Sequence, residues 1–391
     1  MEHNYKRLVS FALALIVVLS YMNMRVFAVE PARFNVDAKS AIIMEASTGE
    51  ILFEQNADER LAPASVTKVM TMLLIYEAVA QDKIKWDDIV SISENAASMG
   101  GSQIFLEVHE KQTVKDLTKS VVIASANDAA VAMGEFISGS TDAFIELMNR
   151  RAKELGMVNS QFKNACGLDA EGHFTSARDI AIMTRELVIN HPEVLELAQT
   201  WQDTIIHKTA KGESEFGLTN TNKLIRRYQG ATGLKTGSTG KALYCLSATA
   251  ERDGLNLISV VLGSPTPDIR FGEVMKMFDF GFANYKTVTG DAAGTIVGQI
   301  AIQKGTTDFA DAAVKEHISR VGSKSGQTEV TAEILLDQFI TAPTTAGTRC
   351  GEIVYTYNGE VIGRSDLITN TDIHRASFFD MMKRVLEIAT E

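Results

Sequence analysis

A mostly apolar run from Val66 to Val79 constrains the fold of this chain more than any other feature. It is rich in helix formers and contains neither glycine nor proline, so it predicts a long buried helix. Pro63 precedes it, which places the start of the helix near Ser65. Residues three apart in the first turn of a helix share a face, so the Lys68 amine is expected to reach the Ser65 hydroxyl.

The rest of the chain predicts mixed α and β structure. Residues 41 to 54 form two short strands around a Ser-Thr-Gly turn, and residues 113 to 190 are mostly helical, beginning at a capping sequence, Thr113 to Asp116. Residues 230 to 263 form strands, the last two joined at Asp253-Gly254. After about Tyr285 the sequence consists of short alternating segments separated by glycine, serine, threonine and proline, which predicts a small all-β domain. Within it, Asn-Gly at 358 and 359 indicates a hairpin. A length of 391 residues also favours two domains.

The two ends predict an exported protein held at a membrane surface. A basic start, an uncharged run from Leu8 to Leu19 and small residues before Ala28 indicate a signal peptide over residues 1–28. An uncleaved anchor is the alternative, although the run is shorter than the roughly 20 residues of a membrane span. At the other end, Ser377 and Asp380 form a capping sequence for an amphipathic helix whose apolar side holds Phe378, Met381, Met382, Val385 and Ile388. This helix is expected to lie on a membrane, the alternative being that it packs on the β-rich domain.

Composition excludes several other classes of protein. A net charge of −11 argues against nucleic acid as a partner. The cysteines at positions 166, 245 and 350 are too far apart for a disulfide framework, and no cluster of cysteine and histidine suggests a metal. They are expected to be buried as small apolar residues. We expect no metal and no organic cofactor.

Three short motifs occur in one order: Ser65-Val66-Thr67-Lys68, Ser125-Ala126-Asn127 and Lys235-Thr236-Gly237. Each alone is weak evidence, because a serine followed three residues later by a lysine arises by chance about once in a chain of this length. Together, with the first at a helix start, the second in a helical region and the third on a strand, they form a combination typical of one kind of serine enzyme.

The chemistry of such an enzyme explains these residue types. A serine hydroxyl is a poor nucleophile and needs an adjacent base. Lys68 can be that base only when it is neutral, and both burial and the second cation of Lys235 disfavour its charged form. The free N–H groups at the helix start can stabilise the oxyanion that develops on an attacked carbonyl, which makes the Ser65 amide one oxyanion donor.

The other two motifs predict a proton path and a substrate site. Ser125 is expected to relay a proton to the leaving amine, and the Asn127 amide to hold a peptide group of the substrate. Lys235 and Thr236 are expected to bind a carboxylate, while Gly237 lets the strand approach the substrate closely. That strand becomes a docking edge for an extended peptide. A cap or a solvated position is the alternative for Ser125 and Asn127.

The chain resembles the D-alanyl-D-alanine carboxypeptidases, the low-molecular-mass penicillin-binding proteins of the bacterial wall, and is most similar to those of Gram-positive endospore formers. Beyond the motifs, the resemblance covers RLAPASVTKVMTMLL at 60–74, SMGGSQIFLEVHE at 98–110, ELGMVNSQFKNACGLDAEGHFTSARDIA at 154–181 and TNKLIRRYQGATGLKTGSTGKALYCLSATA at 221–250.

The resemblance implies an α+β fold in four parts: signal peptide 1–28, β-lactamase/transpeptidase-like catalytic domain 29–285, β-rich domain 286–370 and amphipathic anchor 371–391. It implies that Ser65 is acylated by stem peptides ending in D-Ala-D-Ala, and by β-lactams, on the cell wall side of the cytoplasmic membrane. It also implies that the Ser238 amide is the second oxyanion donor and that Arg270 helps to hold the terminal carboxylate. A surface arginine is the alternative for Arg270. Cys166 departs from the family pattern, and we assign it no catalysis.

Two other functions fit part of this pattern. A serine β-lactamase shares the three motifs, but the sequence has Ser-Ala-Asn in the second motif, a β-rich tail of about 100 residues and no recognisable glutamate for deacylation. A non-catalytic wall-binding protein would not need Ser65, Lys68, Ser125 and Lys235 together.

Overall fold

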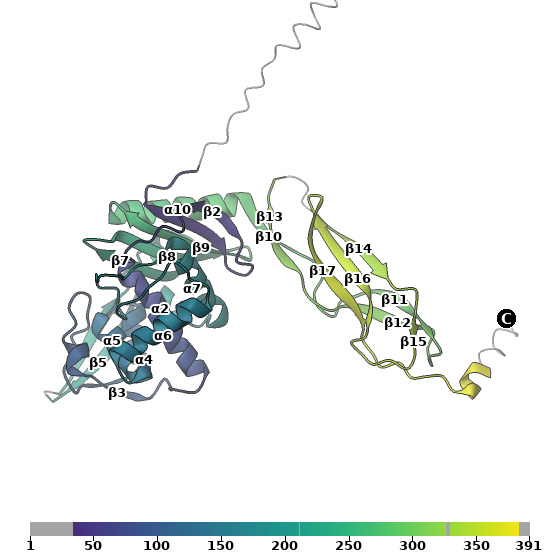
Figure 1. The fold of residues 1–391 in the computed structure, drawn as a ribbon, viewed down its shortest axis with the longest axis horizontal. Coiled ribbons are helices and arrows are strands. Elements are labelled where there is room, and N and C mark those ends of the chain that lie inside the picture. The colour runs from purple at the N-terminus through teal and green to yellow at the C-terminus, as the bar shows by residue number, and fades with distance from the viewer. Residues whose placement is uncertain (1–33, 211, 326–328, 383–391) are drawn as a thin grey trace, which may run out of the picture. The chain divides into compact units, whose positions relative to one another are not determined.

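The computed structural model describes residues 34–210, 212–325 and 329–382 (Figure 1). Its first part is built on an antiparallel five-stranded sheet in the order β2-β1-β9-β8-β7. The strands are β1 (Ser40–Glu45), β2 (Ile51–Gln55), β7 (Ala231–Thr239), β8 (Leu243–Arg252) and β9 (Leu255–Ser264). The order leaves β7 at one edge of this sheet.

Helices cover both faces of the sheet, as Figure 1 shows. α10 (Pro267–Asn284) lies on one face, where Met277 contacts Ser259 of β9, and α7 (Ala177–Asn190) lies on the other, where Thr184 bonds Ser247 of β8. Beyond α7 lie the helices α2 (Lys68–Ala80), α4 (Val114–Val122), α5 (Asn127–Ser138) and α6 (Thr141–Glu154). Smaller elements are α3 (Glu94–Ala97), α8 (Val194–Gln199), α9 (Leu224–Arg227), and the two-stranded pairs β3 (Ile89–Ser91) with β4 (Lys111–Thr113) and β5 (Gln202–Thr209) with β6 (Gly212–Thr219).

The central helix α2 is the buried helix that the apolar run predicts. Ten of its thirteen residues are buried, because the helix is apolar on all sides and α4, α5, α6 and α7 surround it. The structure refines its start: Ser65 lies in a 3-10 turn, Ala64–Thr67, and Lys68 is the first α-helical residue. The predicted capping start of α4 is also present, since Thr113 Oγ1 accepts from the Asp116 amide at 3.0 Å.

The later part of the chain is a β domain. Its main sheet has the order β14-β16-β17-β12-β11-β15, and a separate pair joins β10 to β13. The strands are β10 (Tyr285–Thr289), β11 (Ile296–Gln303), β12 (Phe309–Val314), β13 (Ser319–Ser323), β14 (Val330–Leu336), β15 (Ile340–Thr341), β16 (Arg349–Tyr357) and β17 (Glu360–Thr369). A separate apolar core around Ile353, Tyr355 and Leu367 holds it together.

The hairpin predictions are confirmed. Asn358 and Gly359 join β16 to β17 with φ values of 52° and 81°, and Asp253 and Gly254 join β8 to β9 with 52° and 76°. A two-residue hairpin turn of this kind needs positive φ at both positions, which Asn-Gly and Asp-Gly tolerate best. The three cysteines are free and buried, as expected. The α+β fold class is therefore confirmed, with a mixed first domain followed by an all-β domain.

The two terminal predictions lie largely outside the described residues. The signal peptide falls wholly on residues that the structure does not describe. The C-terminal helix begins at Phe378, and its capping box is formed, since the Ser377 amide donates to Asp380 Oδ2 at 2.8 Å. Val385 and Ile388 lie beyond the last described residue. Among the described residues, no helix is long and apolar enough to cross a membrane.

Candidate active site

Ser65 and Lys68 come together at the start of α2. Lys68 Nζ donates a hydrogen bond to Ser65 Oγ at 3.1 Å. The contact is local, because the 3-10 turn and the first turn of α2 place side chains three residues apart on one face. A nucleophile and a candidate base are thus within hydrogen-bonding distance before any substrate binds.

The Lys68 amine is fully buried and has two further acceptors. Asn127 Oδ1 lies 2.6 Å from Nζ, and the carbonyl oxygen of Cys166 lies 2.8 Å away. Burial lowers the Lys68 pKa from 10.5 to about 8, although the nearby Cys166 thiol and the Asp128 carboxyl act in the opposite direction. At pH 7 roughly a tenth of Lys68 is therefore neutral, far more than at its ordinary pKa.

This arrangement aims the lone pair of a neutral Lys68 at Ser65. A neutral amine has two N–H bonds and one lone pair, whereas the charged form has three N–H bonds. Asn127 Oδ1 and the Cys166 carbonyl can only accept, so they take the two hydrogens. The lone pair then faces Ser65 Oγ, which is the geometry a general base needs.

The second cation, Lys235, lies on β7 and is also buried. Its Nζ donates to the Thr236 carbonyl at 3.1 Å. Burial, followed by the charges of Lys68 and Arg270, holds the Lys235 pKa well below its usual range. For Lys68 itself, burial is the largest cause of the shift, so desolvation contributes more to its neutral form than the Lys235 charge does.

Strand β7 packs directly on the turn that carries Ser65. A side-chain carbon added at Gly237 would lie 2.9 Å from the Ser65 amide nitrogen and 3.0 Å from the Pro63 carbonyl oxygen, so a larger residue would push the strand away. Thr236 Oγ1 donates to Thr221 Oγ1 at 2.7 Å, and Ser238 follows as an exposed residue of the same edge strand. The structure thus brings the third motif against the first.

The second motif lies at the start of α5. Ser125 is buried, has a positive φ of 61° and lies two residues before the first residue of the helix. Asn127 is the first residue of α5, and its Nδ2 donates to the Gly100 carbonyl at 2.7 Å. An amide nitrogen carries two hydrogens, so this bond leaves one for the predicted contact with a substrate. Asn127 also orients Lys68, a contact that the sequence did not predict.

Arg270 is a buried residue, not a surface arginine. It is 7 % exposed near the start of α10, and its Nη1 lies 3.4 Å from the Gly237 carbonyl and 3.3 Å from the Cys245 carbonyl. Its guanidinium carbon stands 4.4 Å from the centre of the Phe271 ring. Burial lowers its pKa to about 10. Arg270 therefore supports β7 beside Lys235, and its contact with a substrate carboxylate stays a prediction.

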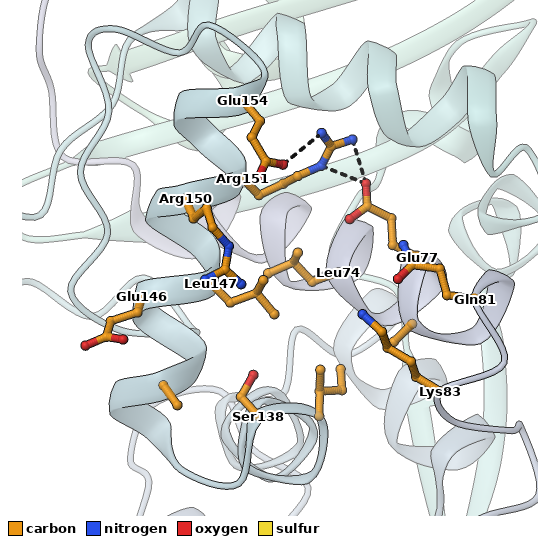
Figure 2. A pocket seen from close by; sticks show the side chains of 13 residues that line it. Leu74, Glu77, Gln81, Lys83, Ser138, Glu146, Leu147, Arg150, Arg151 and Glu154 are labelled. Atoms are coloured by element: carbon orange, nitrogen blue, oxygen red, sulfur yellow. Dashed lines mark hydrogen bonds and ion pairs between the residues drawn. The ribbon is translucent and has the colours of Figure 1, made fainter.

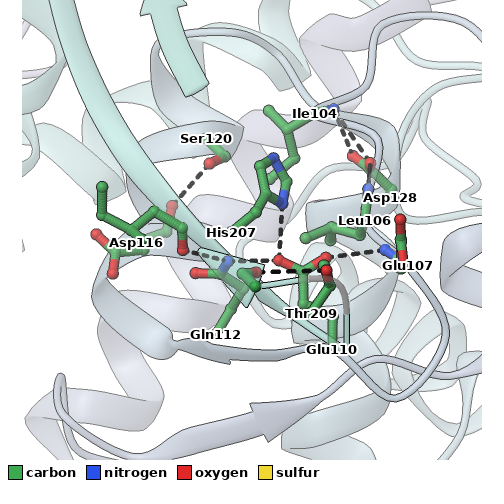
Figure 3. Close-up of polar contacts among 12 residues, drawn as sticks. Ile104, Leu106, Glu107, Glu110, Gln112, Asp116, Ser120, Asp128, His207 and Thr209 are labelled. Carbon is green, nitrogen blue, oxygen red and sulfur yellow. Dashed lines mark hydrogen bonds and ion pairs between the residues drawn. The ribbon is translucent and has the colours of Figure 1, made fainter. Parts of the chain in front are cut away.

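The loop before α4 is anchored to the site by carboxylates that the sequence did not indicate (Figure 3). Asp128, next to Asn127, accepts from the amides of Ile104 and Leu106 at distances of 3.1 to 3.2 Å. The buried Glu110 holds the other end of the loop and contacts His207 Nδ1 at 2.7 Å. Asp128 lies on α5 and Glu110 at the end of the loop, and neither belongs to one of the three motifs, so only the structure shows that they fix the loop beside Asn127.

A large cavity lies elsewhere in the molecule. It has a volume of about 780 Å³ and lies between α2 and α6, where Arg151 bonds both Glu77 and Glu154 (Figure 2). Lys83 and Arg150 also line it. None of the residues predicted from the motifs lines this cavity. This cavity is therefore separate from the site formed by the three motifs.

A buried lysine hydrogen-bonded to a serine at a helix start, beside a glycine on an edge strand, is the arrangement expected of a serine hydrolase. Comparison of the chain with known protein families identifies which serine hydrolases it is related to. Residues 25–266 match the D-alanyl-D-alanine carboxypeptidase family, and residues 285–375 match the C-terminal domain of penicillin-binding protein 5. The chain belongs to the D-alanyl-D-alanine carboxypeptidase family, and it is a penicillin-binding serine peptidase.

Similar proteins match over most of the chain. It is 45 % identical to the D-alanyl-D-alanine carboxypeptidase DacF of Bacillus subtilis, over 90 % of this chain and 89 % of that protein. It is 35 % identical to DacC of Escherichia coli, over 88 % and 86 %. Penicillin-binding protein 5 of Haemophilus influenzae has a similar structure, with a TM-score of 0.73 and 32 % identity, over 87 % of this chain and 98 % of that one.

Proposed function

We propose that the chain removes the terminal D-alanine from peptidoglycan stem peptides that end in D-Ala-D-Ala. The observation that supports this most directly is the hydrogen bond between Ser65 Oγ and the buried Lys68 amine, whose pKa is about 8. It supplies an activated hydroxyl, which acyl transfer to serine requires. The peptide specificity rests on family membership and on the cationic residues beside the edge strand.

In the proposed reaction, Ser65 Oγ attacks the carbonyl carbon of the penultimate D-alanine while its proton passes to Lys68. The amides of Ser65 and Ser238 donate to the resulting oxyanion. The C–N bond then breaks, Ser125 relays a proton to the departing amine, and D-alanine leaves. Water activated by Lys68 hydrolyses the ester and restores Ser65. A β-lactam would acylate Ser65 in the same way and leave a slowly hydrolysed adduct.

The terminal carboxylate of the substrate is assigned to Lys235, Thr236 and Arg270. A free carboxylate distinguishes a carboxypeptidase substrate from an internal peptide bond, so the site needs a cation there. Lys235 lies on β7, the strand that packs on the Ser65 turn, and a bound carboxylate would favour its charged form despite its burial. This assignment gives the clearest test of the proposed function.

Substituting Lys235→Ala should lower kcat/KM for D-alanine release from a peptide ending in D-Ala-D-Ala by about 10²-fold, because a charged hydrogen bond to the carboxylate is lost. The same peptide with an amidated C-terminus should be a poor substrate for both forms, so the variant should lose selectivity between the two. Lys153→Ala, which removes an exposed lysine at the end of α6, is the control. Unchanged selectivity in Lys235→Ala would refute the carboxylate assignment.

The lifetime of a penicillin adduct separates this function from that of a serine β-lactamase. A carboxypeptidase should retain the adduct, whereas a lactamase should release it rapidly. The match of residues 285–375 to the C-terminal domain of penicillin-binding protein 5 favours the carboxypeptidase. Failure to form any adduct would favour the non-catalytic wall-binding protein.

We also propose that the chain is exported and held on the outer face of the cytoplasmic membrane by its C-terminal helix. Phe378 and Phe379 are 73 % and 80 % exposed, and Met381 and Met382 are about half exposed. The preceding segment belongs to the β domain, because Ile373 is buried in its core and pairs with Thr344. A truncation that tests anchoring alone must therefore leave Ile373 in place.

Truncation after Ala376 should move the mature enzyme from the membrane fraction to the soluble fraction while hydrolysis of a soluble D-Ala-D-Ala peptide persists. The apolar helix is expected to supply the membrane affinity, and the retained chain keeps the bond from the Ala376 amide to the Lys304 carbonyl. Fractionation and thermal unfolding measure the two effects. A truncated protein that unfolds, or that stays on membranes, contradicts the proposed anchor.

A further inference from the structure

The turn formed by residues 164–168 bonds the Lys68 amine and packs on the backbone beside Ser65. The Cys166 carbonyl accepts from Lys68 Nζ at 2.8 Å, and the Ala165 carbonyl accepts from Thr71 Oγ1 of the same helix at 2.6 Å. Gly167 has a positive φ of 90°, and a side-chain carbon there would lie 1.9 Å from the Ala64 carbonyl oxygen. The turn is therefore packed against the backbone next to Ser65.

One side chain, Asn164, organises this turn. Its Oδ1 accepts from three successive amides, those of Cys166 at 3.2 Å, Gly167 at 2.6 Å and Leu168 at 3.1 Å. Its Nδ2 donates to the Leu168 carbonyl at 2.9 Å. When three consecutive N–H groups converge on one oxygen, the peptide planes are fixed and the opposite carbonyls of the turn are free to point at α2.

We propose that Asn164 is a positioning residue that acts on Lys68 through the Cys166 carbonyl. The inference rests on the proposed role of Lys68 as the base. Asn164 fixes the second of the two acceptors that take the hydrogens of the neutral amine, and Asn127 provides the first. Without the Cys166 carbonyl, the amine can rotate and its lone pair no longer points steadily at Ser65 Oγ.

This role predicts opposite effects of two substitutions. Asn164→Ala removes the common acceptor and releases the Cys166 carbonyl, so the ammonium form of Lys68 loses a hydrogen-bond partner and its pKa falls. Asn164→Asp keeps an acceptor oxygen for the three amides and adds a negative charge two residues before the one that provides the carbonyl, so the Lys68 pKa rises. Two other groups that influence Lys68, Lys235 on β7 and Asp128 on α5, are the same in both variants. The Cys166 thiol, which donates to Asn164 Oδ1 at 3.5 Å, loses this acceptor in Asn164→Ala and keeps an acceptor oxygen in Asn164→Asp.

The test measures the rate constant for acylation by a fluorescent penicillin between about pH 6 and pH 10, using the mature chain. The maximum acylation rate of Asn164→Ala should be about 10- to 100-fold lower than that of the unsubstituted enzyme. Its pH limb, the range of pH over which the acylation rate rises as Lys68 loses its proton, should move to lower pH. Asn164→Asp should keep a maximum within a few-fold of the unsubstituted enzyme, with the limb moved to higher pH by about 0.5 to 1 unit. Restoration of the maximum by aspartate is a result that general destabilisation would not give.

Asn149 provides a matched control. Its side chain also binds backbone groups, accepting from the Phe162 amide at 2.8 Å and donating to the Phe162 carbonyl at 2.9 Å, but it does not bond the turn. Asn149→Ala and Asn149→Asp should lower the unfolding temperature without moving the pH limb. If Asn164→Ala does not fold, Thr71→Val removes the Ala165 contact at nearly constant volume and should lower the maximum rate.

Two results would overturn the positioning role: pH limbs that coincide in Asn164→Asp and the unsubstituted enzyme, or limbs that move equally in the Asn149 and Asn164 variants. Either result would leave the proposed function intact, because that function is tested separately at Ser65, Lys68 and Lys235.

Discussion

Substituting Ser65→Ala is expected to lower D-alanine release and penicillin labelling by about 10⁴-fold or more. The variant lacks the oxygen that forms the acyl bond, and no neighbouring group can replace it. The fold should persist, because the half-buried hydroxyl lies in the 3-10 turn before α2 and the hydrogen bond that it loses is the one from Lys68. Lys68 keeps its bonds to Asn127 and Cys166 in the variant.

Peptide mapping after labelling with a fluorescent penicillin makes this test specific. The unsubstituted protein should carry a single adduct on the peptide that contains Ser65, and folded Ser65→Ala should carry none. Ser214→Ala, at an exposed position of β6, is the control for the loss of a serine hydroxyl. An adduct on another peptide, or residual acylation within tenfold of the unsubstituted rate, would move the nucleophile away from Ser65.

Contacts set by local geometry were predictable from the sequence. The Ser65–Lys68 contact follows from a spacing of three residues at a helix start, and the Asn358-Gly359 turn follows from the φ values that a two-residue hairpin needs. The long buried helix followed from its composition. In each case, the residues that determine the structure are neighbours in the chain.

Contacts between distant segments were not predictable in the same way. Asn127 and Cys166 are 59 and 98 residues away from Lys68, and the Cys166 contact uses a backbone carbonyl that every residue type possesses. The hairpin of β5 and β6 was missed because most of its side chains are exposed, so its sequence lacks a clear apolar alternation. The burial of Arg270 also depends on tertiary packing, because its charge alone favours the surface.

The sequence identified the motif residues but not what orients them. Lys68 was expected to be neutral because of burial and Lys235, and the structure assigns the larger effect to burial. One of the two acceptors that aim its lone pair, Asn127, belongs to the second motif, but that motif predicted a contact with the substrate and not one with Lys68. The other, the Cys166 carbonyl, belongs to none of the three motifs. Positioning groups of this kind are visible only once the chain is folded.

The Lys68→Ala variant is expected to acylate about 10²- to 10⁴-fold more slowly than the unsubstituted enzyme, because a positioned general base is lost. Its pH dependence identifies the cause. Acylation needs neutral Lys68, so the rate of the unsubstituted enzyme should rise with pH up to the Lys68 pKa of about 8 and level off above it. Below that pKa the ammonium has no lone pair for the Ser65 proton, and the rate should fall about tenfold per pH unit.

In Lys68→Ala, this pH limb should disappear along with most of the rate. Stopped-flow acylation of both proteins across the same pH range measures the two effects together, and thermal unfolding checks that the variant is folded. A folded variant that acylates near the unsubstituted rate and keeps a limb would point to Lys235, the other buried amine of the site, as the base. A slow variant without a limb would assign proton transfer to Lys68, because no other group then titrates in the acylation step.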